Sequence, residues 1–415
     1  MKYADIQKLQ DAGLITGEQR DKIIAHLHLK EDGGNRFLAI VCFAIALLVL
    51  AAPVRGADAP EDYLTAEQLR QAKQMDTGRA FTPEQVKAAE ARSQANPKDL
   101  DARLRLLGYY DPSHKSSVEK KELWKHFAPL VLGIIENHPE SDLAGETGAM
   151  LLARFDELPD SGDWEKGAAL WDKLMAANPT NAQIVGQAAV YRSWNRFRPR
   201  TETLSLFEKA CQLDPKNSKW PRLLGKMYSE QAGLERSPEL AGKALAMLER
   251  ADTLAGTPLT VEDDAALAMA AGQAEQWAKV FQYGTNAIVR LNSARRDWNY
   301  GNLVHDVNAM LCLAALHGGD KKLAGEYLLC AGRSPGSPQL NSFGPDFSYA
   351  RKLLRAGETN VVLQYLDLVG NFWGNTNRPQ RYVGDDFDLK KARLLEKYRQ
   401  DIRAGKIPAE GRWRQ

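Results

Sequence analysis

Several residue types that would mark a familiar chemistry are scarce in this sequence of 415 residues, which has four cysteines and seven histidines. Four cysteines in a chain of this length exclude a scaffold held together by disulfides. The histidines are dispersed and do not have the spacing of metal ligands, and neither a zinc-protease His pair nor a glycine-rich phosphate loop is present. We therefore expect no metal, no cofactor and no catalytic residue.

A surplus of one charge is also missing, because 55 Lys and Arg face 53 Asp and Glu and leave a net charge of +2. Proteins that bind nucleic acids usually concentrate basic residues against the phosphates, so no nucleic-acid partner is expected. With 44% hydrophobic and 26% charged residues, the composition is that of a folded globular protein. The length allows two or three domains or one elongated repeat array.

One long apolar run is present, at residues 37–54, which read FLAIVCFAIALLVLAAPV. It is long enough to cross a bilayer, which takes about 17–25 residues, and it lacks the polar face of a surface helix. The sequence thus predicts a transmembrane helix at 36–55. A cleaved signal sequence is the alternative, with Ala57-Asp58-Ala59 as the cleavage site. The 36 residues before the run are long for a leader, which favours an uncleaved anchor.

The charges beside this run predict its orientation. Lys22, Lys30 and Arg36 precede it, whereas Arg55 follows it among acidic residues. Since positive charges tend to remain in the cytoplasm, residues 1–35 are expected to form a short cytoplasmic helical segment. The predicted location is the inner membrane, with a single pass and a periplasmic carboxy-terminal region.

The segment before the run, ADIQKLQDAGLITGEQRDKIIAHL, resembles the cytoplasmic lead-in of a family of uncharacterised bacterial membrane proteins. Members of that family usually continue with several spans, whereas one is predicted here. No activity follows from this resemblance.

From about Pro60 onward the pattern is helical and punctuated by prolines. Four proline steps, at Pro97, Pro139, Pro179 and Pro215, are separated by 42, 40 and 36 residues. This is the period of repeats built from pairs of helices. An unrelated bundle of alanine-rich helices is the alternative.

The stretch TLSLFEKACQLDP, residues 203–215, and the residues after it resemble the tetratricopeptide repeat. Ala210 would fit under a neighbouring helix, Gly225 would let two helices approach closely, and Pro215 would end the unit. The pattern recurs at Gly167/Trp171/Pro179, Ala244/Leu248/Ala251 and Ala324/Leu328/Ala331. The resemblance implies an all-α fold, a tetratricopeptide-like α-solenoid of about seven or eight helix pairs. Its expected divisions are a linker with first helices at 56–95, the solenoid at 96–373, and a carboxy-terminal helix and tail at 374–415.

A narrower resemblance is to a group of bacterial secreted or membrane-anchored tetratricopeptide proteins without an assigned reaction. It covers most of residues 95–411 and departs from the group at the tail, Ala409 to Trp413. The segments that carry it are ARLRLLGYY, GIIENHPES, LFEKACQLDPKNSKW, DWNYGNLVHDVN, GSPQLNSFGPDFSYARKLLRAGE, VVLQYLDLVGNFW and IRAGKIPAEG. No reaction follows from this resemblance, and the leading interpretation of the whole sequence is a membrane-tethered, non-enzymatic scaffold for protein interactions.

One candidate site is a polar pocket built from two neighbouring repeats. Asn302, His305 and Asn308 recur every three residues and so share a broad helical face. Asp306 is expected to point elsewhere, which leaves His305 without a titratable partner. The predicted pocket comprises Trp298, Asn299, Asn302, His305, Gln339, Asn341 and Ser342. Such a pocket would suit an exported ligand-binding protein or enzyme; alternatively, these amides hydrogen-bond the loop backbone between repeats.

The second candidate site is a basic groove. In tetratricopeptide proteins the first helix of each pair lines the concave groove, and Lys219, Arg222 and Lys226 lie three or four residues apart on such a helix. Arg192 belongs to an arginine cluster shortly before it. These four cations predict a protein or acidic peptide as the partner, and a solvated charged face is the alternative.

Overall fold

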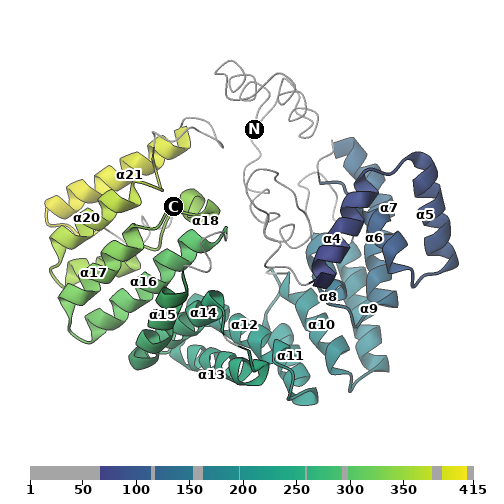
Figure 1. Ribbon diagram of the computed structural model, residues 1–415, viewed down its shortest axis with the longest axis horizontal. Helices are drawn as coiled ribbons and strands as arrows, with labels where there is room; N and C mark the ends of the chain where they lie inside the picture. Colours follow the sequence, from purple (N-terminus) through teal and green to yellow (C-terminus); the bar gives the residue numbers. More distant parts are fainter. Residues whose placement is uncertain are drawn as a thin grey trace. The chain divides into compact units, whose positions relative to one another are not determined.

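The computed structural model describes residues 66–113, 117–152, 162–195, 197–257, 259–291, 298–375 and 386–408. Within these ranges there are 18 α-helices, α4 to α21, and no strand (Figure 1). The prediction of an all-α fold is therefore confirmed. The predicted cytoplasmic segment and the apolar run at 37–54 lie outside the described residues. Among the helices that are described, none is both long and apolar enough to span a membrane.

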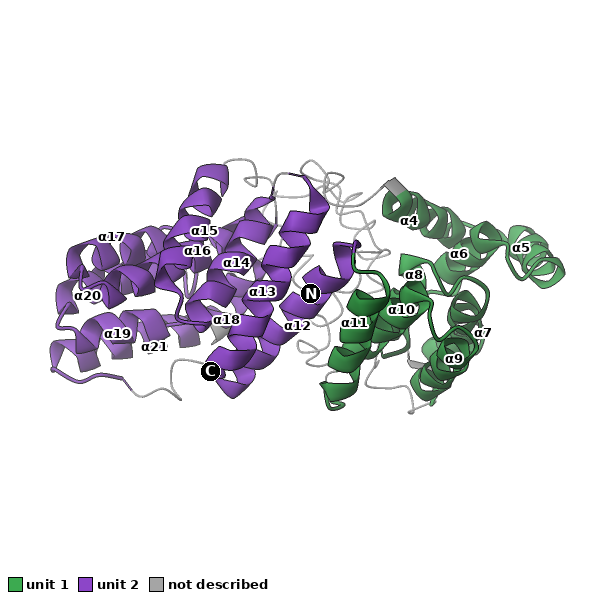
Figure 2. Ribbon diagram, turned by 90° about the horizontal axis from the view of Figure 1, so that it is seen from below, with its two compact units in different colours: residues 1–215 green, residues 216–415 purple. Residues whose placement is uncertain are grey.

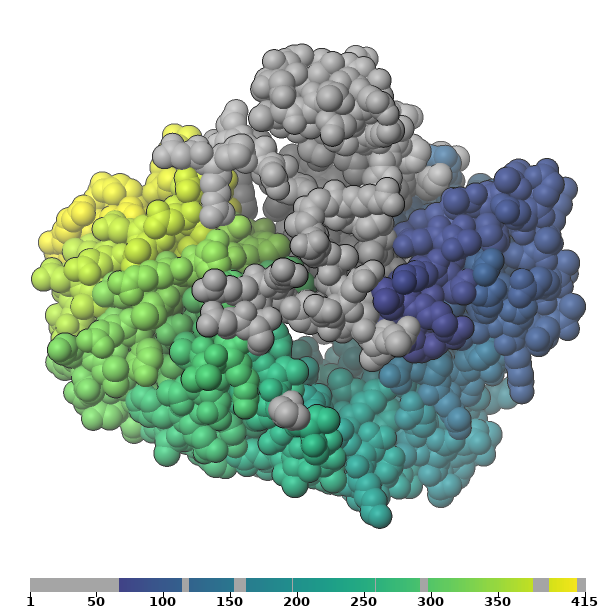
Figure 3. All heavy atoms as spheres, in the orientation of Figure 1, coloured from purple at the N-terminus to yellow at the C-terminus, as the bar shows by residue number. Residues whose placement is uncertain are grey.

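The chain forms two compact units, residues 1–215 and 216–415 (Figure 2). The boundary between the units falls directly after Pro215, inside the range predicted as one solenoid. Within each unit the colours that mark the sequence change gradually across the surface, so segments near in sequence lie near one another (Figure 3).

Unit 1 contains eight described helices, and four of them end just before a proline step. Asn96, His138, Asn178 and Asp214 follow the last residues of these four helices and precede the prolines. A residue before proline avoids the helical conformation, and proline cannot continue a helix. The helices of unit 1 are α4 (Ala66–Arg79), α5 (Pro83–Ala95), α6 (Leu100–Tyr109), α7 (Ser117–Asn137), α8 (Asp142–Leu152), α9 (Asp163–Ala177), α10 (Ala182–Ser193) and α11 (Thr201–Leu213).

Side-chain caps fix the starts of several of these helices. Thr82 and Gln85 form a capping box at the start of α5, Asp99 accepts from the backbone of Ala102 at α6, and Asn181 caps α10. Each cap satisfies backbone N–H groups that have no partner inside the helix. The turns between helices are thus set by local sequence.

In unit 1, α4 and α6 cross at glycines. A Cβ atom at Gly108 would lie 1.9 Å from the carbonyl oxygen of Met75, and one at Gly78 would lie 1.8 Å from that of Arg105. The two backbones are in direct contact, which only glycine permits. Trp171 and Val131, both with 0% exposure, belong to the same apolar core as Met75 and Leu107 of the crossing helices.

Unit 2 is built mainly from pairs of consecutive helices, with α12 on α13, α14 on α15 and α16 on α17. A Cβ atom at Gly225 would lie 2.8 Å from Cγ of Leu248, so Gly225 lies at a close contact between α12 and α13. The helices of unit 2 are α12 (Lys219–Glu235), α13 (Pro238–Ala255), α14 (Val261–Gln273), α15 (Trp277–Arg290), α16 (Tyr300–His317), α17 (Lys321–Gly332), α18 (Pro338–Phe343), α19 (Ser348–Arg355), α20 (Thr359–Val369) and α21 (Asp386–Arg403).

The carboxy-terminal helix α21 is part of the core of unit 2. Its Tyr398 is 1% exposed and meets the ring of Phe347 edge to face, with 5.8 Å between centroids. Phe347 also contacts Trp373, at 5.6 Å. This aromatic cluster joins α21 to α19 and to the loop after α20.

Candidate functional site

The predicted basic groove begins with three cations on α12. The Lys219 ammonium lies 4.7 Å from the ring centroid of Trp220, a cation–π distance. Arg222 forms an ion pair with Asp263 at the start of α14. Lys226 is exposed to solvent. One of the three cations therefore fastens α12 to α14.

Asp263 also caps the helix on which it lies. Together with Thr260 it forms the capping box at the start of α14. Burial opposes ionisation of Asp263, but the hydrogen bond and charge of Arg222, together with hydrogen bonds from Thr260, outweigh burial and hold the pKa of this carboxyl below its ordinary value. The pair thus joins a helix cap to a neighbouring helix.

Arg192, the fourth predicted groove residue, lies in unit 1 and is 7% exposed. Its Nη2 atom donates to Oδ1 of Asp172 on α9 at 2.6 Å, and its Nε atom donates to Oε1 of Glu202 on α11 at 2.9 Å. A buried guanidinium with two carboxylate partners ties α9, α10 and α11 together. Arg192 therefore has a structural role in joining these three helices.

The structure brings three residues of the predicted polar pocket together around Asn302. Nδ2 of Asn302 donates to Oδ1 of Asn299 at 2.5 Å and to Oε1 of Gln339 at 3.0 Å. Its Oδ1 atom accepts from the hydroxyl of Ser337 at 2.6 Å. Ser337, which sequence reasoning missed, also caps α18 by accepting from the backbone of Leu340. Both ends of the Asn302 amide are thus occupied.

A close backbone approach explains why this network exists. A Cβ atom at Gly301 would lie 1.9 Å from the carbonyl oxygen of Gly336, and the hydroxyl of Ser334 donates to the carbonyl oxygen of Gly301 at 2.7 Å. The polar side chains therefore hold the start of α16 against the loop before α18. This arrangement favours the structural interpretation of the region over a ligand pocket.

His305 faces a different neighbour. Its ring is 1% exposed, and Nε2 lies 2.9 Å from the hydroxyl of Tyr365 on α20. Nδ1 lies 2.9 Å from Oδ1 of Asp306, so the expectation that Asp306 points elsewhere was wrong. Burial raises the pKa of Tyr365 well above its ordinary value, so its hydroxyl keeps the proton that it donates to His305. The three side chains satisfy one another between α16 and α20.

The remaining residues of the predicted pocket are placed separately. The carbonyl oxygen of Asn341 accepts from Nζ of Lys391 on α21 at 2.5 Å. Ser342 is half-buried, and Trp298 is 39% exposed just before α16. The hydrogen bond between Lys391 and Asn341 attaches α18 to the carboxy-terminal helix.

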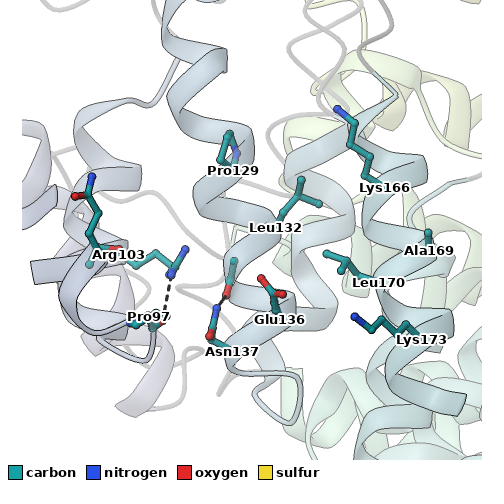
Figure 4. A pocket seen from close by; sticks show the side chains of 13 residues that line it. Pro97, Arg103, Pro129, Leu132, Glu136, Asn137, Lys166, Ala169, Leu170 and Lys173 are labelled. Atoms are coloured by element: carbon teal, nitrogen blue, oxygen red, sulfur yellow. Dashed lines mark hydrogen bonds between the residues drawn. The ribbon is translucent and has the colours of Figure 1, made fainter. Parts of the chain in front are cut away.

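A region that sequence reasoning missed is an open groove of about 750 Å³ in unit 1 (Figure 4). Its lining residues on α7 and on α9 each recur every three or four positions, so each helix contributes one face. The α7 face is Pro129, Leu132, Gly133, Glu136 and Asn137, and the α9 face is Lys166, Ala169, Leu170 and Lys173. Ser93, Gln94, Pro97 and Arg103 complete the lining.

Arg103 extends from α6 to α7 beside this groove and is 7% exposed (Figure 4). Its Nη2 atom donates to the carbonyl oxygen of Pro97 at 3.1 Å, and its Nη1 atom donates to that of Leu130 at 3.4 Å. Gly133 makes room for it, because a Cβ atom there would lie 1.9 Å from Nη1. No described carboxylate forms an ion pair with Arg103, and burial lowers the pKa of its guanidinium, against the effect of Glu136. A buried cation beside a cleft is typical of a functional site.

The spacing of Lys166, Ala169, Leu170 and Lys173 is visible in the sequence, but the expected repeat register places the groove on other helices. In the expected repeat register, each helix that ends at a proline step is the second of its pair, whereas tetratricopeptide grooves are lined by first helices. The main walls of this groove come from α7 and α9, which both end at such steps.

Comparisons with known proteins give no family for this chain. A scan against family models and a search of curated proteins both found no match. Within the described residues, no group of three or more His, Cys, Asp and Glu side chains is arranged to hold a metal ion. The groove is therefore the feature of the described residues that points to a function.

Proposed function

We propose that this protein is a non-enzymatic interaction scaffold that holds a segment of a partner protein in the groove of unit 1. The observation that carries the proposal is the open volume of about 750 Å³ between two helix faces, with an apolar centre and cations around it. Recognition sites of this size combine an apolar lining with a few polar groups that fix orientation.

The proposal is non-enzymatic because the reactive side chains in unit 2 are engaged in packing. His305 is occupied by Asp306 and Tyr365. Burial raises the pKa of Cys312 to about 12, which keeps it a thiol and a poor nucleophile. The alternative function, an exported ligand-binding protein or enzyme using the polar region near Asn302, loses support because these polar atoms bond to one another.

We also propose the class of helical repeat and the location of the protein. Helix ends at the four proline steps and the close contact at Gly225 support a tetratricopeptide-like α-solenoid.

The apolar run at 37–54 supports a single-pass anchor in the inner membrane with the helical units in the periplasm. Protease added to intact spheroplasts should then digest the region after Pro60. Protection of that region, with the first 30 residues cut instead, would reverse the topology.

Two exposed alanines of unit 1 allow a matched test of the groove. Ala169 on α9 lines it and Ala88 on α5 does not. Ala169→Trp should fill the groove without disturbing the core and should abolish capture of the partner after crosslinking in native membranes. Ala88→Trp, an equal change at an exposed helix position outside the groove, should leave capture as in the wild type. Equal capture by both variants would refute the groove as the binding site.

A further inference from the structure

The α9 wall of the groove carries a simple pattern of charge. Lys166 and Lys173 lie at its two ends, seven residues apart, with Ala169 and Leu170 between them. At a rise of 1.5 Å per residue, the Cα atoms of the two lysines lie about 10 Å apart along the helix. The wall therefore presents two cations that flank an apolar centre.

The opposite wall completes the apolar centre. Leu132 of α7 and Leu170 of α9 point toward one another, and Lys173 extends from α9 toward the α7 side (Figure 4). Both leucines are half-buried and so retain surface that a ligand could cover. An apolar side chain placed between them would gain burial on both sides.

The cations are available to a ligand to different degrees. Lys173 is exposed and makes no hydrogen bond or ion pair with a described residue. Lys166 pairs with the largely buried carboxylate of Asp163 at 2.7 Å, but its own side chain is 63% exposed, and an ammonium group has three donors, so it can keep this partner and also donate to a ligand. Arg103 adds a buried positive charge, whereas Glu136 is the one carboxylate in the lining. The groove thus has a surplus of positive charge.

We propose, resting on the proposed function, that the segment held in this groove is acidic and extended. It carries two carboxylate side chains three positions apart with an apolar residue between them. A polyproline-like segment rises about 3.1 Å per residue and turns once in three residues, so two such carboxylates lie about 9 Å apart on one side. That spacing matches Lys166 and Lys173. The apolar side chain between the carboxylates points about 120° away from them around the segment, toward the space between Leu132 and Leu170.

The test uses the full chain and four fluorescein-labelled peptides, read by fluorescence anisotropy. The first contains Ser-Glu-Pro-Leu-Glu-Ser, the second has the same composition with adjacent glutamates, and the third has glutamines in place of the glutamates. The fourth replaces leucine by serine. We expect the first peptide to bind about tenfold more tightly than each of the others, and we expect added salt to weaken it as exposed charges are screened. Equal binding of all four, or no binding, overturns the proposal.

Three variants locate the effect. Lys166→Glu with Lys173→Glu should weaken the first peptide at least about tenfold, because two favourable charge pairs become repulsive. Lys121→Glu with Lys209→Glu changes the same charge at two exposed lysines of unit 1 that do not line the groove, and should leave binding unchanged. Glu136→Gln should strengthen binding about two- to fivefold. Unaltered binding in both groove variants overturns the proposal.

These results separate the two proposals. If Ala169→Trp blocks capture of the partner but the four peptides bind alike, the scaffold function stands and the acidic segment is refuted. If Ala169→Trp captures the partner normally, the groove itself is not the site of interaction.

Discussion

The polar region around Asn302 in unit 2 and the groove of unit 1 both gather polar side chains, yet they differ in how those side chains are partnered. Both ends of the Asn302 amide bond to other side chains, and the network secures the close approach of Gly301 to Gly336. In the groove, Lys173 faces open volume, and Arg103 has no carboxylate in an ion pair among the described residues. Polar groups that satisfy one another stabilise a fold, whereas cations without a carboxylate partner beside an open volume can serve a ligand.

The largest expected effect comes from the glycine beneath the polar network. Gly301→Ala would place a carbon 1.9 Å from the carbonyl oxygen of Gly336, so two backbones must separate. We expect a loss of about 3 kcal/mol in the free energy of unfolding, the upper end for overpacking. Denaturant unfolding of the full chain measures it.

Gly242 on α13 provides the control for that substitution. A Cβ atom there would meet nothing within 4 Å, so Gly242→Ala should stabilise the protein by about 0.5–1 kcal/mol through helix propensity. Equal stability of the two alanine variants would show that the approach at Gly301 is not close.

A second effect separates the polar region from the groove. Asn302→Leu leaves Gln339 and Ser337 without their partner and should lower stability by about 1–3 kcal/mol, while peptide binding in the groove stays unchanged. Lys173→Gln should do the opposite, with stability within about 0.5 kcal/mol of the wild type and weaker binding. Parallel losses of stability and binding in both variants would contradict the division of roles.

The ion pair between Arg222 and Asp263 predicts a smaller, pH-dependent effect. Because the folded state lowers the pKa of Asp263, the pair contributes stability above the ordinary value of 3.8, and this contribution is lost as pH falls through the lower folded value. Arg222→Gln should therefore cost about 1–2 kcal/mol at pH 7, and its difference from the wild type should shrink below pH 3.8.

Chemical denaturation across this pH range measures the difference. Arg198 pairs with Glu165 on the surface of unit 1, with side chains 57% and 52% exposed. Arg198→Gln is the control and should show no comparable dependence on pH. A constant cost of Arg222→Gln at every pH would mean that the pair does not act through the charge of Asp263.

Much of the fold could be predicted from local sequence, but the groove could not. Helix ends at the four proline steps depend on neighbouring residues, so the sequence contains them directly. The position of Arg103 depends on the carbonyl of Leu130, 27 residues away, and on the missing side chain of Gly133. The spacing of residue types along the sequence does not reveal such long-range contacts.

The orientation of Asp306 shows a second limit of sequence reasoning. Adjacent residues on a helix point about 100° apart, which suggested that Asp306 would turn away from His305. The carboxylate instead reaches back to Nδ1 of the histidine, because a rotatable side chain can cross that angle. Likewise, Lys219, Arg222 and Lys226 share a helix face, but the sequence could not reveal that Asp263 lies opposite Arg222.

The smallest expected effect is at Lys226, which is exposed on α12. Lys226→Glu should change stability by no more than about 0.5 kcal/mol, as surface substitutions usually do. If the unit 1 groove is the binding site, this variant should also capture the partner in wild-type amounts. Loss of capture at normal stability would return the basic face of α12 to consideration.

The most direct test of the central claim is site-specific photocrosslinking of the full chain in the cells that produce it. A benzophenone amino acid replaces Ala169 in the groove or, as the control, the exposed Ala88 on α5, which does not line the groove. The account predicts an adduct from position 169 and none from position 88, with the crosslinked partner residue inside an acidic segment identified by mass spectrometry. Adducts of equal yield at both positions, or none at position 169, would contradict the claim that this groove holds a partner protein.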